Sequence, residues 1–403
     1  MIDPPGRPGR RSITALIAII VVVAVLAGLF AGHALLTGLD GSPDLPGAGS
    51  PSPVGALQSD PPASPGAGPT VSPGPVVGVP AGIDATGRTD VIRSLQAILD
   101  AAPNGATVRL PAGAHYLVGT TLELTGRHDL HLDGGGASLE AKTGTGAARP
   151  VIRITGSTGI TLRNLVLVGA NSRPGVYSPA REHDHGVSIV GSRATSLAGL
   201  TIEQTSGDCV YVADQAGAWS DGVSLVDSTC RGPGRNGVAV VGGRNIDVER
   251  TAFSNVGYHV LDLEPNQGPP LEGAANVTFH ANIVSAPVTG FVIAANGWGP
   301  VDHVTVAGNV LTGLALNVTV APAAGSGYRR STIEISANRS DTLADQADPL
   351  MQFEAVDDLT ITGNLQPLGR STVLAGVANS CRVTISGNQL GAGQASLINA
   401  PAC

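Results

Sequence analysis

The sequence predicts an all-β solenoid, a fold in which short strands stack as successive coils. A tandem pattern returns every 23–31 residues from about residue 150 to the end, and a fixed period of this length indicates stacked structural units. Each repeat holds at least two short strands with period-2 alternation, separated by Gly, Asn or Ser turns. Only 3% of the residues are aromatic, as expected for a narrow core of Val, Ile, Leu and Ala. The 403 residues therefore predict one long solenoid rather than two or three globular domains.

The first 81 residues are expected to precede the solenoid. Residues 1–12 are basic and predicted to be cytoplasmic, and residues 13–36 are almost wholly apolar. A bilayer is spanned by about 20 apolar residues, and two arginines just before the segment predict a signal anchor, with the C-terminal body outside the plasma membrane. A cleaved signal peptide is the alternative, and it would make the protein secreted. Residues 37–81, rich in Pro, Gly and Ser, predict a disordered linker.

The folded body is predicted over residues 82–403, and its first long element is a helix over residues 90–100. Apolar residues recur there at the spacing of one helical face. Asp90 is expected to cap the helix and the turn at Pro103 to end it. Such a helix would cover the open end of the first coil. Short strands are expected next, at 107–110, 115–118, 122–124 and 129–133.

A column of polar residues is expected at one turn of successive coils. Several strands end in Asn, as in Val304-Thr-Val-Ala-Gly-Asn309. Stacked side chains at this position would satisfy the backbone groups of a buried turn and one another. Asn also tolerates left-handed turns, and the two explanations are compatible. The predicted column consists of Thr205, Ser228, Thr251, Asn282, Asn309, Asn338, Asn364 and Asn388.

The body resembles proteins of the pectate-lyase-like superfamily. The similar residues are Gly82-Ile-Asp-Ala-Thr-Gly-Arg-Thr-Asp90, the predicted helix, and Thr107-Val-Arg-Leu-Pro-Ala-Gly-Ala-His-Tyr116. The later coils are similar to the generic repeats of that superfamily, so the resemblance covers about residues 82–403. It implies a right-handed parallel β-helix. It implies no single activity, because the superfamily includes lyases, hydrolases, epimerases and adhesins.

The four cysteines predict two disulfides. Cys209 and Cys230, like Cys381 and Cys403, are separated by about one coil. Stacked strands lie about 4.8 Å apart, which is compatible with disulfides outside the cytosol. The register of the repeat, however, places Cys230 above Gly207, a diagonal offset from Cys209 of about 7–8 Å that the turns would have to adjust. Small buried thiols in the core are the alternative.

One face of four consecutive coils gathers ionisable side chains. Strand alternation turns Val187, Val210, Val238 and Leu261 inward, and it sends Ser188, Tyr211, Ala239 and Asp262 outward as one column. Glu264 belongs to the next column, and polar residues stand at the strand starts. Long parallel β-helices bind extended polymers along such a face, and pairs of carboxylates cleave glycosidic bonds. The candidate catalytic residues are Asp208, Asp262, Glu264, His185, His259, Tyr211 and Arg235.

Asp262 and Glu264 are expected to act as acid and base. They lie two residues apart on one strand, roughly 6.5–7 Å at their roots, which permits retaining or inverting geometry. Asp208 would be a third carboxylate, and the other four residues would position the substrate or transfer protons. The expected partner is a polysaccharide that the protein binds and cleaves or epimerises. A solvated acidic strand on a non-catalytic protein of adhesion or envelope structure is the alternative.

Two motifs resemble those of polygalacturonases, with departures. Asp208 in Ser206-Gly-Asp-Cys209 is similar to their Gly-Asp-Asp-Cys segment but supplies one Asp, and His185-Gly186 precedes it rather than follows it. Their Arg-x-Lys clamp has no counterpart, since Lys142 is the one lysine. A lyase would instead need calcium, for which Asp208, Asp262 and Glu264 could supply ligands. No other cofactor is predicted.

A few further side chains have the chemistry of binding groups. His183 and His185 have the spacing of a metal-binding pair on a strand, but a zinc site needs more ligands, and a polar loop is the simpler interpretation. Trp219 and Trp298 lie between strands, where indoles can stack on sugars or pack the turns. The formal net charge of −8 argues against nucleic acid as a partner, because such proteins carry a basic surface.

Overall fold

The computed structural model describes residues 74–143, 149–268, 271–295, 298–322, 328–344, 349–367, 369, 373–390 and 395–398. The predicted cytoplasmic segment 1–12, the membrane anchor 13–36 and the linker up to residue 73 lie outside these residues. Within the described ranges, no helix is both long and apolar enough to cross a membrane.

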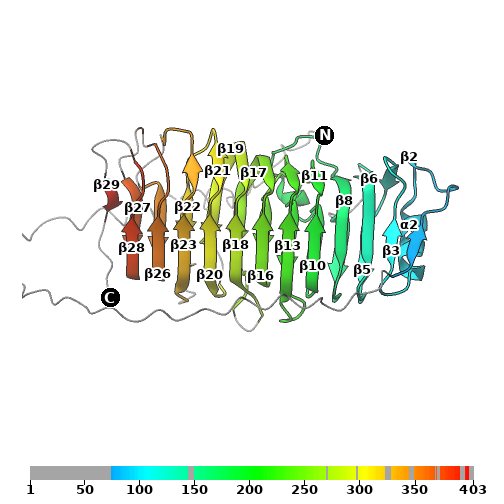
Figure 1. Cartoon of the computed structure of the whole chain (residues 1–403), viewed down its shortest axis with the longest axis horizontal. Coiled ribbons are helices and arrows are strands. Elements are labelled where there is room, and N and C mark those ends of the chain that lie inside the picture. The colour runs from blue at the N-terminus through cyan, green and yellow to red at the C-terminus, as the bar shows by residue number, and fades with distance from the viewer. Residues whose placement is uncertain are drawn as a thin grey trace, which may run out of the picture. The chain divides into compact units, whose positions relative to one another are not determined.

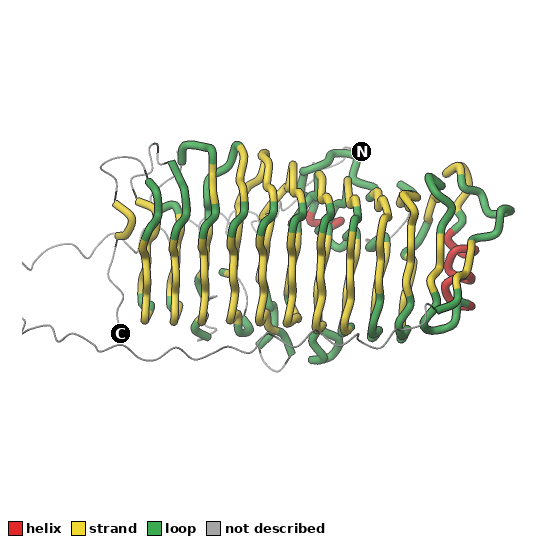
Figure 2. The backbone as a smooth tube through the Cα atoms, viewed as in Figure 1, coloured by secondary structure: helices red, strands yellow, loops and turns green. Residues whose placement is uncertain are grey.

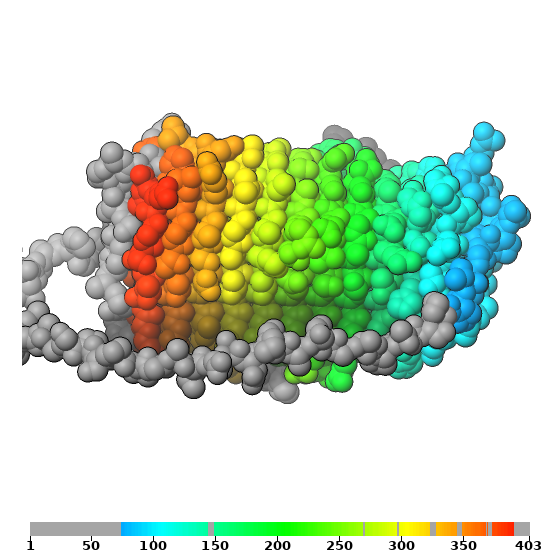
Figure 3. Space-filling model, viewed as in Figure 1, coloured from blue at the N-terminus to red at the C-terminus, as the bar shows by residue number. Residues whose placement is uncertain are grey.

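The described residues form an all-β solenoid of about ten turns, which confirms the predicted fold class. Its strands lie side by side along the stack (Figure 1) and pair in parallel from coil to coil. In Figure 2, turns separate the strand segments at equivalent places of successive coils. The space-filling view in Figure 3 shows the coils as adjacent bands in sequence order. The strands fall into three columns.

The first column extends along the whole stack. It consists of β1 (Val76–Gly78), β3 (Thr107–Arg109), the beginnings of β6 (His131–Ala141) and β8 (Thr161–Val168), β10 (Arg193–Ala198), β13 (Ser220–Val226), β16 (Gly242–Glu249), β18 (Gly273–His280), β20 (Val301–Ala307), β23 (Arg330–Ser336), β26 (Val356–Thr362) and β28 (Cys381–Ser386). Strand β1 lies ahead of residue 82, the predicted start of the body.

The second column follows the first around each coil. It consists of β2 (Thr86–Asp90), β4 (His115–Val118), the ends of β6 and β8, β11 (Thr201–Glu203), β14 (Thr229–Arg231), the beginnings of β17 (Ala252–Leu263) and β19 (Ile283–Ala294), β21 (Val310–Thr312) and β24 (Arg339–Ser340).

The third column carries the repeat that contains the predicted site. It consists of β5 (Leu122–Thr125), β7 (Ile152–Thr155), β9 (Val187–Val190), β12 (Val210–Ala213), β15 (Val238–Val240), the ends of β17 and β19, β22 (Val318–Val320), β25 (Met351–Glu354), β27 (Val373–Ala378) and β29 (Ala395–Ile398).

Helix α2 (Ile92–Ala101) precedes the first complete coil and lies at the N-terminal end of the stack in Figure 1. It buries Ile92, Leu95 and Leu99, because these residues recur on one helical face. The N-cap residue is Val91 rather than the predicted Asp90, although Asp90 Oδ1 accepts a hydrogen bond from the Ile92 N–H at 3.1 Å. A single turn of 3₁₀-helix, η2 (Pro179–Arg181), interrupts the long connection from β8 to β9.

The Asn column exists, and its asparagines are buried except for the half-buried Asn388. From Asn282 to Asn388, each Oδ1 accepts the backbone N–H of the residue one coil earlier, at 2.9–3.1 Å. Each Nδ2 also donates to a backbone carbonyl, as from Asn282 to Val248 at 3.0 Å. These side chains therefore satisfy backbone groups that no ladder bond reaches.

Thr205 was wrongly placed in this column. The strand register puts Leu200 over Ser228 instead, and the Leu200 N–H donates to Ser228 Oγ at 3.1 Å. The apolar Leu200 carries no polar signal at this position of the repeat, whereas Thr205, five residues later, does.

The disulfide Cys209–Cys230 is present, with a Cα–Cα distance of 6.0 Å. The register predicted for it was wrong. Cys230 stacks on Ile202 and not on Gly207, so the bridge joins β14 to the residue just before β12 across the corner of a coil. The second predicted bridge includes Cys403, which lies outside the described residues.

Candidate functional site

The third column has the register that the repeat predicts around the candidate site. Tyr211 pairs with Ser188 on one side and with Ala239 on the other. Ala239 in turn pairs with Asp262 on β17. The outward column is therefore continuous over β9, β12, β15 and β17, and it brings together side chains from four coils.

This outward column is largely covered, a feature that the sequence analysis did not predict. Ser188, Ala239 and Asp262 are all buried. The connection between β8 and β9 supplies Tyr177 and Glu182 to the wall of a cavity of about 240 Å³. The cavity is lined by Tyr177, Glu182, Arg235, Tyr258, His259, Asp262, Glu264 and Ile293.

Arg235 lies at the centre of the charged groups. Its Nη2 is 2.7 Å from Glu264 Oε2 and 3.6 Å from Asp262 Oδ2, and its Nη1 is 3.5 Å from Asp208 Oδ2. Burial alone would lower the pKa of Arg235, but the three carboxylates outweigh it and raise that pKa. The guanidinium is thus held charged, with Nη1 and Nη2 both facing carboxylates.

Asp208 is fully buried behind the cavity. Its Oδ1 accepts the Asn236 N–H at 2.9 Å, and its Oδ2 lies 3.2 Å from His185 Nδ1. The His185 ring stacks on Tyr211 with centroids 4.6 Å apart. Burial and the charge of Asp208 raise the pKa of Tyr211 to about 12, so its phenol is neutral at physiological pH. Of these three residues, Asp208 contacts Arg235 directly, and none of the three lines the cavity.

Gly207 makes this packing possible. A Cβ at this residue would lie 2.3 Å from the Glu182 carbonyl oxygen and 2.7 Å from His185 Nδ1. Real Cβ atoms do not tolerate such distances, so the absent side chain allows the β8–β9 connection to approach β12.

Asp262 is the carboxyl group with the most altered acidity at the site. Burial, followed by the nearby charge of Glu264, raises the pKa of Asp262 to about 7, although Arg235 opposes the shift. Its Oδ2 accepts a hydrogen bond from Asn236 Nδ2 at 2.9 Å. Burial also raises the pKa of Glu264, and Arg235 again opposes the shift. Near neutral pH, Asp262 therefore exists in both protonated and ionised forms.

His259 is a neutral group on the cavity wall. Burial, with the charge of Arg235, lowers the pKa of His259 to about 4. Its Nδ1 atom is buried and has no hydrogen-bond partner. Tyr258 packs edge-on against this ring at 4.6 Å, and it also lies 6.0 Å from the ring of Tyr177, a roughly stacked neighbour. The two tyrosines give the cavity an aromatic wall.

All seven predicted site residues lie in this one cluster, but not all of them line the cavity. Four line the cavity, and His185, Asp208 and Tyr211 lie behind it. Three residues of the site had no predicted role: Tyr177, Glu182 and Asn236. Asn236 stands at a strand start, so the repeat could have indicated it. Tyr177 and Glu182 lie in the β8–β9 connection, where no repeat predicts the position of a side chain.

The site does not suit calcium. This ion takes six to eight oxygen ligands in most sites, yet the three carboxylates here converge on guanidinium nitrogens of Arg235. Nor do His183 and His185 form a metal pair, because the side chain of His183 is 72% exposed and that of His185 is 4% exposed. His183 faces solvent, whereas His185 is buried against Tyr211 and Asp208.

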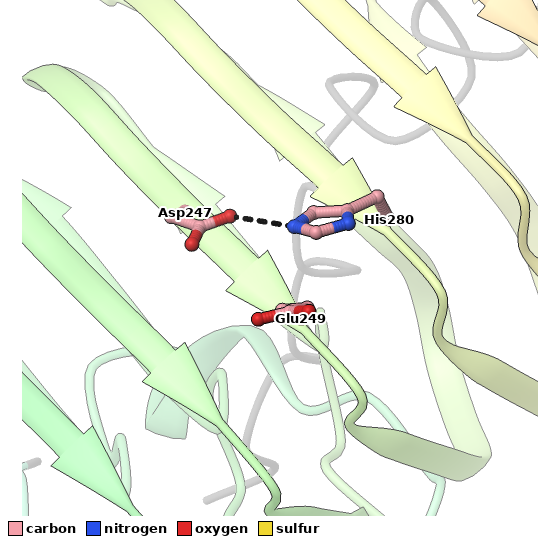
Figure 4. A group of neighbouring side chains, drawn as sticks. All are labelled: Asp247, Glu249 and His280. Atoms are coloured by element: carbon pink, nitrogen blue, oxygen red, sulfur yellow. Dashed lines mark hydrogen bonds and ion pairs between the residues drawn. The ribbon is translucent and has the colours of Figure 1, made fainter. Parts of the chain in front are cut away.

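A second group of ligand-type side chains lies on the first column. Asp247 and Glu249 on β16 and His280 on β18 bring their polar atoms within 4.8 Å of one another. Figure 4 shows the Asp247 carboxylate directed at the His280 ring, 3.1 Å from Nε2. Glu249 also pairs with Arg250. Asp247 and His280 thus pair with each other and Glu249 with Arg250, and none of the three lines the cavity.

The tryptophans do not line the cavity. Trp219 Nε1 donates to the Leu271 carbonyl at 3.1 Å, and its ring lies against Gly273. Turn packing therefore accounts for Trp219. Trp298 is half exposed, and its backbone N–H donates to the Pro265 carbonyl.

Comparisons of sequence give a distant relative. No protein-family model matches the chain. The pertactin autotransporter of Bordetella bronchiseptica is 26% identical over 223 residues, which cover 51% of this chain and 23% of the pertactin chain. The protein thus aligns with about a quarter of the length of this relative. The pertactin autotransporter of Bordetella parapertussis matches to the same extent.

Comparisons of structure give many similar folds at low sequence identity. The surface protein and adhesin PfbA of Streptococcus pneumoniae has a TM-score of 0.55 at 14% identity, covering 80% of this chain and 98% of its own. The Dettilon tailspike protein has a TM-score of 0.53 at 14% identity, with 80% and 68% covered. A family 28 exopolygalacturonase of Yersinia enterocolitica has a TM-score of 0.52 at 13% identity, with 80% and 77% covered. Together with the parallel strand register, these likenesses show that the chain has the pectate-lyase-like, right-handed parallel β-helix fold.

Proposed function

We propose that this protein is an extracytoplasmic β-helix that binds a polysaccharide at the Arg235 cavity and cleaves or epimerises it there. One observation carries the proposal: Asp262 and Glu264 both face a small cavity and contact the same nitrogen of Arg235. Paired carboxylates of unequal acidity are the groups that glycosidic chemistry requires. A cavity of about 240 Å³ is below the roughly 300–1,000 Å³ of most ligand pockets, so it suits about one sugar residue.

Asp262 would act as the acid. Its pKa of about 7 keeps a proton available near neutral pH, where acid catalysis is most efficient. Because Oδ2 already accepts a hydrogen bond from Asn236, the proton would reside on Oδ1. That oxygen would protonate the glycosidic oxygen as the bond to the leaving sugar breaks.

Glu264 would act as the nucleophile or base. Its contact with Arg235 favours the ionised form. Both carboxylates lie within 3.6 Å of one nitrogen, which fits the separation of about 5–5.5 Å in retaining glycosidases better than the longer inverting one. Asp208, His185 and Tyr211 would then position Arg235, and His259 would contact the sugar.

The predicted membrane anchor at residues 13–36 would hold this body outside the cell. The relative is an autotransporter and PfbA is a surface protein, which supports a location outside the cytosol. A cleaved N-terminal segment would give a secreted protein with the same site.

A non-catalytic adhesin is the second candidate. It is supported by the likeness to PfbA, a surface adhesin, and by the missing second Asp and Lys clamp of polygalacturonases. In that case the cavity would bind a glycan without turnover.

The test is a panel of polysaccharides presented to the full-length chain, scored for retention and for product release, with and without added calcium. We expect retention by at least one polymer and turnover that disappears in the Asp262→Asn, Glu264→Gln double variant. An Asp247→Asn, Glu249→Gln double variant removes the same charge on another face and is the matched control. Retention without turnover would leave the adhesin candidate, and no retention by any polymer would overturn the proposal.

A further inference from the structure

We infer that the glycan bound at the Arg235 cavity carries no carboxylate or sulfate groups. The inference rests on the proposed function and names the chemical class of its substrate. Two observations support it: carboxylates line the cavity, and the guanidinium of Arg235 is already paired with carboxylates of the protein.

The cavity is negatively charged. Glu182, Asp262 and Glu264 line it, and Arg235 is the one guanidinium or amine among the lining residues. Asp208 lies directly behind, with its Oδ2 3.5 Å from Arg235. An anionic sugar would therefore enter beside several carboxylates, and like charges brought together in a partly buried site oppose binding.

Arg235 is not available to compensate for an anionic sugar. Its Nη2 contacts Glu264 and Asp262, and its Nη1 faces Asp208. A substrate carboxylate would have to displace at least one of these pairs, and the displaced carboxylate would remain buried, or half-buried in the case of Glu264, without its partner. Removing one partner of a buried ion pair is strongly unfavourable.

The remaining wall suits hydroxyl groups and sugar C–H bonds. His259 is uncharged near neutral pH, and its buried Nδ1 has no hydrogen-bond partner. Tyr177 and Tyr258 present partly exposed rings to the same cavity. Aromatic rings with polar edges are typical of surfaces that contact sugar rings.

The experiment compares polymers that differ only in charge. The full-length chain is run in native gels that contain polygalacturonate or its fully methyl-esterified form, and a β-glucan or its carboxymethylated form. We expect the uncharged member of a pair to retain the protein at least about tenfold more strongly than the anionic member. Equal or stronger retention by the anionic member would overturn the inference.

Two variants separate the site from the overall charge of the protein. Glu264→Gln removes one cavity carboxylate and frees one donor of Arg235, so we expect the difference within a polymer pair to shrink. Glu249→Gln removes the same charge on β16 and should leave the difference unchanged. An equal effect of the two variants would assign the preference to net charge and overturn the inference. If wild-type protein is retained by none of the four polymers or of the wider panel, the proposed function fails instead.

Discussion

Replacing Asp262 by Asn is expected to change how the stability of the protein depends on pH. Asp262 is buried at 4% exposure, and its pKa is raised from 3.8 to about 7. A carboxyl group with a raised folded-state pKa binds its proton more tightly in the folded protein. Its contribution to stability is therefore fully present below pH 3.8 and is lost as pH rises through about 7.

The size of the effect follows from the shift. A rise from 3.8 to about 7 corresponds to about 4 kcal/mol at about 1.4 kcal/mol per pKa unit. Part of this stability is already lost below pH 5, so about 3 kcal/mol of the loss falls between about pH 5 and pH 8. The Asn variant does not ionise, keeps an oxygen for the Asn236 amide, and should therefore escape the loss.

Urea unfolding of wild type and Asp262→Asn at pH 5, 6, 7 and 8 tests this reasoning. The variant should gain about 3 kcal/mol relative to wild type across this range. Asp358→Asn is a control without this pH dependence. The hydrogen bond from Arg382 lowers the pKa of Asp358, so this carboxylate stays ionised from pH 5 to pH 8, and the variant should differ from wild type by the same amount at all four pH values. Parallel curves for wild type and Asp262→Asn would refute the assignment of a buried, ionising carboxyl.

Three further changes test the fold. Asn282→Ala leaves the Thr251 N–H and the Val248 carbonyl without partners, so we expect a loss of about 2–5 kcal/mol in urea unfolding, larger than for the half-buried Asn388; equal losses would contradict the role of burial. Gly207→Ala forces a Cβ against the Glu182 carbonyl and should cost about 1–3 kcal/mol and weaken glycan retention, whereas Gly82→Ala, with no atom near its Cβ, should do neither. Reduction of Cys209–Cys230, which closes a loop of 21 residues, should cost about 3 kcal/mol; an unchanged unfolding midpoint with and without reductant would argue against that contribution.

The periodic parts of the site were predictable because strand alternation determines side-chain direction. Once Val210 and Val212 face the core, Tyr211 must face outward, and the same holds for Asp262 between Leu261 and Leu263. Because these strands occupy the same place in successive coils, their outward side chains fall into one column. Alternation places Tyr211, Asp262 and Glu264 outward in this way. The other four predicted residues were found because they stand at or beside the starts of the same strand segments: His185, Asp208, Arg235 and His259.

The other parts of the site lie in segments that do not follow the sequence repeat, so the sequence could not place them. Tyr177 and Glu182 lie in the connection between β8 and β9, where no alternation predicts position. This connection turns an open face into a cavity, and the resulting burial shifts the pKa of Asp262. Leu200 over Ser228 shows the same limit, since an apolar residue breaks the polar column and the register cannot be followed through it.

The order of the coils has a consequence for how the molecule loses structure. Each coil pairs only with its two neighbours, so opening proceeds from coil to coil and is easiest at the ends of a stack. Strands β9, β12, β15 and β17 have further coils on both sides. Amide hydrogens of Val210 and Val238 should therefore exchange with solvent more slowly than those of β1, and the Arg235 cavity would remain assembled while the first coils open and close.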